Sequence, residues 1–316
     1  MFSRLRYWHL VLAVGLFVAA MLYFSRASTQ APAGGAARGG MTAFEGGTFE
    51  ASGVAAVAGA DGVLFVDNGK PGQVFWMRLG PEGRQLGPVK PLSLGADIED
   101  IEGITTDGTH FYVVSSQSRP KAIAKAGLVR FRFDAAGEKV EAAESVGGLK
   151  NFLLENVAEL RGEGELKGKE GGLNIEGVAW DPRGGRLLLG LRSPLAEGNA
   201  LLVPVKLRDP RGAFAAANLE VEGSRAIRLP LGGFGIRGVE YDASAGLFRL
   251  LSGATETQTL TDFGLWEWNG DEKQPAPRQT AKFDRQLKPE GVARARAGGR
   301  EMTIVVFDAG GYTVMN

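Results

Sequence analysis

Residues 173 to 194 read LNIEGVAWDPRGGRLLLGLRSP, and this stretch indicates how the whole chain folds. Glu176 and Gly177 stand at the start of one apolar run, and Arg192 stands at the end of a second run. The turn residues Asp, Pro and Gly lie between the two runs. Short apolar runs on either side of turn residues predict the two antiparallel strands of a hairpin.

The same small motif recurs along the chain, with a glycine at Gly53, Gly103, Gly177, Gly238 and Gly291. Each interval between these glycines is long enough for four short strands, and further apolar runs follow each motif at regular spacing. Antiparallel units repeated in series are typical of a β-propeller, with one blade for each repeat. The sequence therefore predicts an all-β fold, a β-propeller of five blades.

The longest interval, between Gly103 and Gly177, contains a segment of different character. Residues 149–161, LKNFLLENVAELR, have apolar residues at helical spacing, and residues 162–172 are rich in glycine and charge. We interpret residues 147–172 as an insertion between blades two and three, a helix followed by a mobile loop. The same interval also leaves room for a sixth blade.

The two ends of the repeat region predict how the ring of blades closes. After Gly311 only five residues remain, so the last blade lacks a fourth strand. Residues 42–49 precede the first motif, and we expect them to supply that strand. Closure of this kind removes exposed sheet edges. The propeller domain is predicted over residues 44–316.

The N-terminal segment predicts export. Residues 7–24 form an uncharged apolar run that nearly spans a bilayer as a helix, and Arg4 and Arg6 precede it. We expect a signal peptide or membrane anchor over residues 1–27, followed by a flexible linker over residues 28–43. The protein would then be periplasmic, or anchored in the inner membrane and facing the periplasm, with that membrane as a partner if the segment is not cleaved.

The composition excludes several classes of function. Lys plus Arg and Asp plus Glu both number 36, so no net positive charge favours nucleic acid. The chain contains no cysteine, which excludes thiolate nucleophiles and thiolate metal sites. Only His9 and His110 are present, which argues against Ser-His-Asp catalysis and sites with several histidines.

Propeller geometry predicts a ring of polar side chains at one mouth of the central channel. The first strand of each blade lines the channel, and the hairpin returns the end of the second strand to the start of the first. In blade four Arg237 replaces the motif glutamate. The predicted ring consists of Asn68, Glu102, Arg119, Glu176, Arg192, Arg237, Glu290 and Asp308.

Two interpretations of this ring stay open, and they lead to three hypotheses of function. The charges either pin neighbouring blades through ion pairs or converge on a ligand. In the first hypothesis the exported propeller binds a small polar or anionic ligand, or a protein partner, at its charged mouth. The ligand-binding residues would be Arg119, Arg192 and Arg237, with Glu102, Glu176 and Glu290 orienting them.

The second hypothesis is a hydrolase, a phosphoesterase or a lactonase, that uses calcium or magnesium. A hard cation prefers oxygen ligands, which would come from Glu102, Glu176, Glu290, Asp308 and Asn68. Calcium is a cofactor only under this hypothesis, and no other cofactor is indicated. The third hypothesis is a structural scaffold that binds other proteins through its rim and leaves the mouth unused.

A resemblance to a known family rests on LNIEGVAWDPRGGRLLLGLRSPL, on DIEGIT and GLKNFLLENVAEL before it, and on IRGVEYD after it. The chain resembles a widespread bacterial family that is known as a domain of unknown function with a propeller-like fold. It is also distantly similar to esterase-like phytase propellers through the repeated Glu-Gly at strand starts. The resemblance implies the fold and carries over no catalytic residues.

Overall fold

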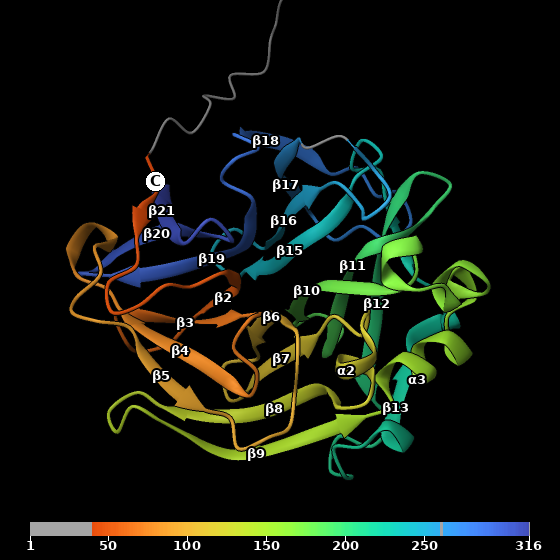
Figure 1. The fold of residues 1–316 in the computed structure, drawn as a ribbon, viewed down its shortest axis with the longest axis horizontal. Helices are drawn as coiled ribbons and strands as arrows, with labels where there is room; N and C mark the ends of the chain where they lie inside the picture. Colours follow the sequence, from red (N-terminus) through yellow and green to blue (C-terminus); the bar gives the residue numbers. More distant parts are fainter. Residues whose placement is uncertain (1–39, 260–261, 316) are drawn as a thin grey trace, which may run out of the picture. The chain divides into compact units, whose positions relative to one another are not determined.

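The repeats fold as five antiparallel sheets arranged around one axis, as Figure 1 shows. The structure is a computed structural model that describes residues 40–259 and 262–315. Each sheet is one blade of a β-propeller, and the five blades follow one another in chain order except where the ring closes. The prediction of a five-bladed propeller is confirmed.

Blades one and two each have four strands in sequential order. The strands of blade one are β2 (Ala51–Ala56), β3 (Gly62–Asp67), β4 (Gln73–Arg78) and β5 (Lys90–Ser93). The strands of blade two are β6 (Ile101–Thr106), β7 (Phe111–Ser115), β8 (Ala126–Asp134) and β9 (Lys139–Gly147). The first strand of each blade is innermost, so β2 and β6 lie next to the axis (Figure 1).

Blade three differs from its neighbours at its outer edge. Its strands are β10 (Asn174–Asp181), β11 (Arg186–Ala196), β12 (Asn199–Leu207), β13 (Leu219–Val221) and β14 (Ile227–Leu229). The two short strands β13 and β14 both pair with β12, so the fourth position of this blade is divided. Blade four is regular, with β15 (Gly235–Asp242), β16 (Leu247–Gly253), β17 (Phe263–Trp268) and β18 (Arg278–Phe283).

Blade five closes the ring with strands from both ends of the propeller. It contains β19 (Pro289–Ala297), β20 (Arg300–Phe307), β21 (Gly311–Met315) and β1 (Thr42–Ala43). Thr42 pairs with Tyr312 and Ala43 with Gly311, so the earliest described strand is the outermost strand of the last blade. The prediction that residues 42–49 supply the missing strand is confirmed.

The segment between blades two and three forms helical turns and no sixth sheet. Helix α3 (Leu149–Asn156) is followed by three 3₁₀ turns at Ala158–Leu160, Glu163–Glu165 and Gly168–Glu170. Leu149, Leu153 and Leu160 are buried in the core between blades two and three. The part of the segment that we expected to be a mobile loop is therefore folded into two short turns, and the helix before it is anchored by apolar packing.

Other helices in the described structure are short. Helix α2 (Pro120–Ile123) follows blade two's second strand and was not predicted. Among residues 40–259 and 262–315, no helix is long and apolar enough to cross a membrane. The apolar helix predicted at residues 7–24 and the linker up to residue 39 lie outside the described residues, so they stay predictions, as does export.

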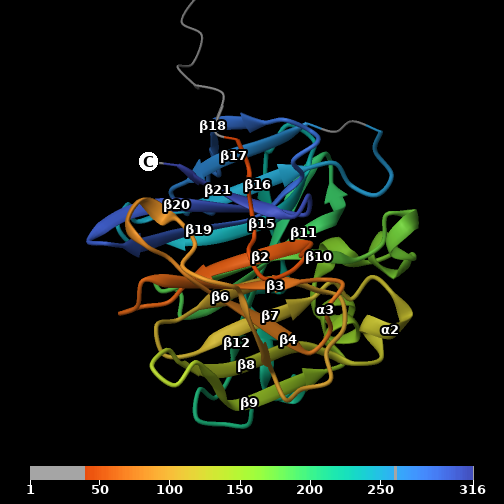
Figure 2. The same cartoon turned by 60° about the vertical axis from the view of Figure 1, so that its left-hand side comes forward.

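Apolar side chains hold neighbouring blades together in five clusters, one for each junction. Because side chains alternate along a strand, one strand contributes to the junctions on both sides of its blade. In β3, Leu64 packs toward blade two, and the next residue, Phe65, packs toward blade five. Figure 2 shows the same blades after a turn of 60°, with blades four and five above and blades one and two below. This alternation explains why the strands read as nearly continuous apolar runs.

A β-bulge occurs at the same place in all five inner strands. In β10, Ile175 pairs with Leu191 and Gly177 with Gly190, so Glu176 is an extra residue without a partner on β11. The register shifts in the same way before the motif glycine of every other blade. The bulge positions are Ser52, Glu102, Glu176, Arg237 and Glu290. A bulge bends its strand and redirects the extra side chain.

The motif glycines form a ring in which each lies against the next inner strand. A Cβ atom on Gly238 would lie 2.4 Å from the carbonyl oxygen of Glu290, and one on Gly291 would lie 2.8 Å from the Cα of Gly53. None of the five motif glycines has a positive φ, so glycine is needed here for space rather than for backbone conformation. Only about 10 Å³ of cavity remains beside this ring, roughly the room of one water molecule.

We predict that Gly238→Ala strongly destabilises the propeller, because the new methyl group would collide with the backbone of blade five. The free energy of unfolding, measured by urea denaturation, should fall by at least about 2 kcal/mol. Gly147→Ala is the matched control, since a Cβ there meets nothing within 4 Å. Equal stability of the two variants would contradict the account of the glycine ring.

Candidate functional site

One cavity at the end of the axis brings together all eight residues that the sequence predicts at the mouth. Its volume is about 430 Å³, within the range of small-ligand sites, and we call it the mouth pocket. The predicted residues that line it are Asn68, Glu102, Arg119, Glu176, Arg192, Arg237, Glu290 and Asp308. The hairpin geometry therefore locates these side chains correctly.

A second cavity of about 400 Å³ lies at the other end of the inner strands. It is lined by residues such as Ala56, Thr106 and Asp242, and by none of the eight predicted residues. The glycine ring lies between the two cavities, with only about 10 Å³ of space beside it. The central channel is therefore divided, and the predicted residues line a pocket that ends at the glycine ring rather than a pore that crosses the propeller.

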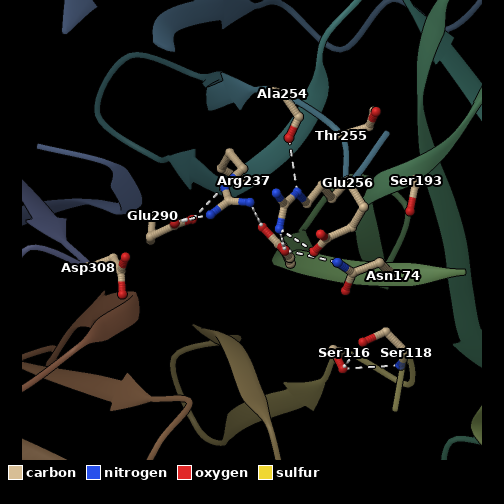
Figure 3. Close-up of polar contacts among 12 residues, drawn as sticks. Ser116, Ser118, Asn174, Ser193, Arg237, Ala254, Thr255, Glu256, Glu290 and Asp308 are labelled. Carbon is tan, nitrogen blue, oxygen red and sulfur yellow. Dashed lines mark hydrogen bonds and ion pairs between the residues drawn. The ribbon is translucent and has the colours of Figure 1, made fainter. Parts of the chain in front are cut away.

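Arg237 binds carboxylates on both sides of its own blade. It donates from Nε to Glu290 Oε2 at 2.7 Å and makes a second contact with Glu290 through Nη2, and its Nη1 lies 2.7 Å from Glu176 Oε2. Figure 3 shows Arg237 with dashed contacts on both sides. Blades three, four and five are thus linked at their bulges, and all three guanidinium nitrogens are engaged by protein.

Arg192 completes the surroundings of Glu176. Its Nη1 lies 3.0 Å from Glu176 Oε1 and 2.8 Å from Glu256 Oε1, and its Nε donates to the carbonyl oxygen of Ala254 at 2.9 Å. Asn174 Nδ2 donates to the same Glu176 Oε1 at 3.0 Å. Glu176 is thus a buried carboxylate whose Oε1 accepts hydrogen bonds and whose Oε2 is held at ion-pair distance by Arg237 without a hydrogen bond among the described residues.

The remaining predicted residues make contacts of their own at the mouth. Arg119 contacts Asp100 at 3.3 Å and makes no ion pair with Glu102. Asp308 pairs with Lys288 at 2.7 Å, whereas Glu290 pairs with Arg237. Asp100 also accepts a short hydrogen bond from Ser116. The arginines and glutamates of the ring thus connect neighbouring blades more than they connect the strands of one hairpin.

Sequence reasoning missed the residues two places before three of the five bulges. Asp100, Asn174 and Lys288 all line the mouth pocket, two positions before Glu102, Glu176 and Glu290 respectively. Residues two apart in a strand face the same side. That period was the available signal for Asn174, which lies in β10 with Glu176, whereas Asp100 and Lys288 lie just before their strands and had no such signal.

Glu102 differs from the other acidic residues at the bulges. It is 8 % exposed and lines the mouth pocket, yet its carboxyl makes no hydrogen bond or ion pair with any residue that the structure describes. Burial raises the pKa of Glu102 well above 4.5, and the negative charges of Glu176, Asp100 and Glu290 raise it further. Arg237 opposes this shift only weakly, since its charge is engaged by two other carboxylates.

The charges of the mouth pocket are arranged in two layers. Acidic residues are deeply buried at its floor, where Arg237 and Arg192 compensate part of their charge. Basic side chains stand at its rim, where Arg119 is 71 % exposed and Lys288 is 56 % exposed. Arg285 is a further exposed basic residue of this rim. A ligand in the pocket would therefore meet an acidic floor and a basic rim.

The oxygen ligands proposed for calcium or magnesium do not gather as a metal site. Within residues 40–259 and 262–315, no group of three or more His, Cys, Asp or Glu side chains is placed to hold a metal ion. Arg237 occupies the space between Glu176 and Glu290, where a shared cation would have to bind. The structure therefore does not gather the proposed donors Glu102, Glu176, Glu290, Asp308 and Asn68 around one point, and two of them already pair with Arg237.

Comparisons with known proteins identify a family and related folds. The model of a family described as "Protein of unknown function (DUF3616)" matches residues 139–311. No curated protein matches the chain. Among solved structures, it is similar to the soluble aldose sugar dehydrogenase of Escherichia coli, with 13 % identity, a TM-score of 0.45 and coverage of 87 % of this chain and 98 % of that chain.

It is also similar to the PQQ domain of a pyranose dehydrogenase from Coprinopsis cinerea. The identity is 10 % and the TM-score 0.44, with 89 % of this chain and 98 % of that chain covered. At identities this low, any function has to be argued from the residues of the chain itself.

We predict that Glu102→Gln removes a loss of stability that the wild type suffers as the pH rises. The folded state holds the Glu102 proton more tightly than the unfolded state, so the free energy of unfolding falls as pH rises from 4.5 to the folded-state pKa. Over that window the variant should gain stability relative to wild type, as measured by urea denaturation. For Glu165→Gln, at an exposed position, the free energy of unfolding should depend on pH as it does in the wild type. Parallel curves for Glu102→Gln would contradict the assignment.

Proposed function

The chain belongs to the DUF3616 family, and we propose, from its own residues, that it binds a small polar ligand in the mouth pocket. The observation that carries the proposal is Glu102, a buried carboxyl that lines a pocket of about 430 Å³ and has no partner among the described residues. Buried polar groups are normally hydrogen-bonded. A polar ligand in the pocket would supply the partner that Glu102 lacks.

The size and composition of the pocket support a small ligand rather than a protein partner. A protein interface buries a large and continuous surface, whereas this site is a recess at the axis with polar residues from all five blades, charged in blades two to five. Side chains that converge from several elements are typical of pockets that fix the orientation of a small molecule. The ion pairs below the rim hold these side chains in place before any ligand arrives.

The arrangement of the arginines refines the kind of contact that we propose. Arg237 uses its three nitrogens on Glu176 and Glu290, so we assign it to the support of the site rather than to ligand contact. Arg119 and Lys288 are more exposed and remain accessible at the rim. An acidic group of the ligand would therefore be bound at the rim, and its hydrogen-bond donors would lie at the floor.

We predict that a small polar compound raises the melting temperature of the full-length protein, because a ligand that binds only the folded state adds stability. The panel, applied after chelation, contains inorganic phosphate, glucose, gluconate, 6-phosphogluconate, glycine and longer amino acids. Asn68→Trp should abolish the stabilisation, since an indole at this position would fill the pocket. Thr109→Trp, in an exposed turn at the opposite end of blade two, is the control that should still respond.

The proposal would be wrong if no compound stabilised the wild type, or if Asn68→Trp and the wild type responded alike. In the first case the charged ring would serve only to link the blades. In the second case the ligand would bind elsewhere on the protein.

A further inference from the structure

The floor of the mouth pocket has hydrogen-bond acceptors that lack donors. Glu102 is more than nine-tenths buried, and its carboxyl faces the pocket without a partner among the described residues. Asn174 is 4 % exposed, and its Oδ1 is likewise buried without a hydrogen bond in that part of the chain. Both groups accept hydrogen bonds when Glu102 is ionised.

The orientation of the Asn174 amide is fixed by its neighbour. Its Nδ2 donates to Glu176 Oε1, and a carboxylate engaged by arginines can only accept. Turning the amide around would place two acceptors against each other. Oδ1 must therefore point away from Glu176, as Figure 3 shows for Asn174. The unpartnered acceptor is thus a consequence of the Arg192–Glu176–Arg237 network.

Within residues 40–259 and 262–315, no cation forms an ion pair with Glu102. The charged groups that act on it come from four elements and are Asp100 before β6, Glu176 on β10, Arg237 on β15 and Glu290 on β19. On its other side, the bulge position of blade one holds the uncharged Ser52. Arg119 at the rim contacts Asp100 instead. The surroundings of Glu102 are therefore short of positive charge.

We propose that the ligand of the mouth pocket is a small zwitterion whose ammonium group pairs with Glu102 and whose acidic group lies against the basic rim. This inference rests on the proposed function and specifies its ligand class. An ammonium group supplies three N–H donors and one positive charge, which suit a buried carboxylate without a counter-charge. Arg119, Arg285 and Lys288 would bind the acidic group.

The same geometry favours an ammonium group over a metal ion or an anionic group at the floor of the pocket. For calcium or magnesium, the described residues offer no group of three or more acidic or histidine side chains placed around one ion, and Arg237 already pairs with Glu176 and Glu290. A purely anionic ligand would place its charge among Asp100, Glu176 and Glu290 and would leave the acceptors without donors. A zwitterion satisfies both layers of the pocket at once.

The pairing predicts how affinity depends on pH. Because burial and the acidic neighbours keep the Glu102 pKa raised, Glu102 must lose its proton to pair with the ammonium group. Below that pKa, affinity should rise with pH by as much as about tenfold per pH unit, with one proton released for each ligand bound. The rise should end at the Glu102 pKa.

The test uses isothermal titration calorimetry of the full-length protein with ω-amino acids from glycine to 6-aminohexanoate. For the chain length that binds best, the matched amine and the matched carboxylic acid are titrated next. We expect the amino acid to bind most tightly, the amine more weakly, and the acid least. Glu102→Gln should weaken amino acid binding at least about thirty-fold, because it removes one partner of a buried ion pair.

Glu165→Gln is the matched control and should bind like the wild type. Titration of the wild type in two buffers of different ionisation enthalpy counts the released proton, so the test stands even if Glu102→Gln fails to fold. Tighter binding of the acid than of the amine, or no proton release, would overturn the inference and leave the proposed function standing. If neither these compounds nor the earlier panel bound, the proposed function would fail as well.

Discussion

The close approach of the five inner strands is the constraint on which the rest of the structure depends. Each motif glycine lies so near the next blade that a Cβ atom would reach its backbone, as at Gly238 against Glu290. The bulge beside each glycine then places one side chain per blade at the same end of the axis. Packing at the centre and the chemistry at the mouth therefore have one origin. The packed ring of glycines, beside which only about 10 Å³ of space remains, separates that mouth from the cavity at the opposite end.

The residue at each bulge decides what the mouth pocket can do. Arginine in blade four stands between two glutamates and pairs with both, which links three blades. Serine in blade one leaves Glu102 with an acidic neighbour on one side and no cation on the other. The bulge residues differ from blade to blade, and this difference, rather than the five-fold repeat, leaves the Glu102 carboxyl without a partner.

Much of this arrangement could be predicted from the sequence, because repeats and turn residues determine blade number and strand positions. The hairpin argument located all eight mouth residues, and the short C-terminal remainder predicted how β1 (Thr42–Ala43) closes the ring. The bulges could not be predicted, since the same residue types occur at unpaired and at paired positions of a strand. Ion pairs between neighbouring blades were one of the two interpretations left open, but the particular partners, such as Arg237 for Glu290 and Lys288 for Asp308, could not be named from the sequence. Where five strands meet, the ion-pair partners depend on distances between side chains of different blades, and these distances cannot be obtained from spacing along the sequence.

The central claim is that Glu102 lacks a cation that the ligand supplies. A carbon-13 NMR titration of the Glu102 side-chain carboxyl, assigned with Glu102→Gln, measures its pKa in the folded protein directly. The account predicts a pKa well above 4.5 without ligand and a lower pKa when an amino acid that binds is added. A pKa near 4.5 in the free protein would contradict it, because Glu102 would then already have the counter-charge or the solvation that we argue is missing.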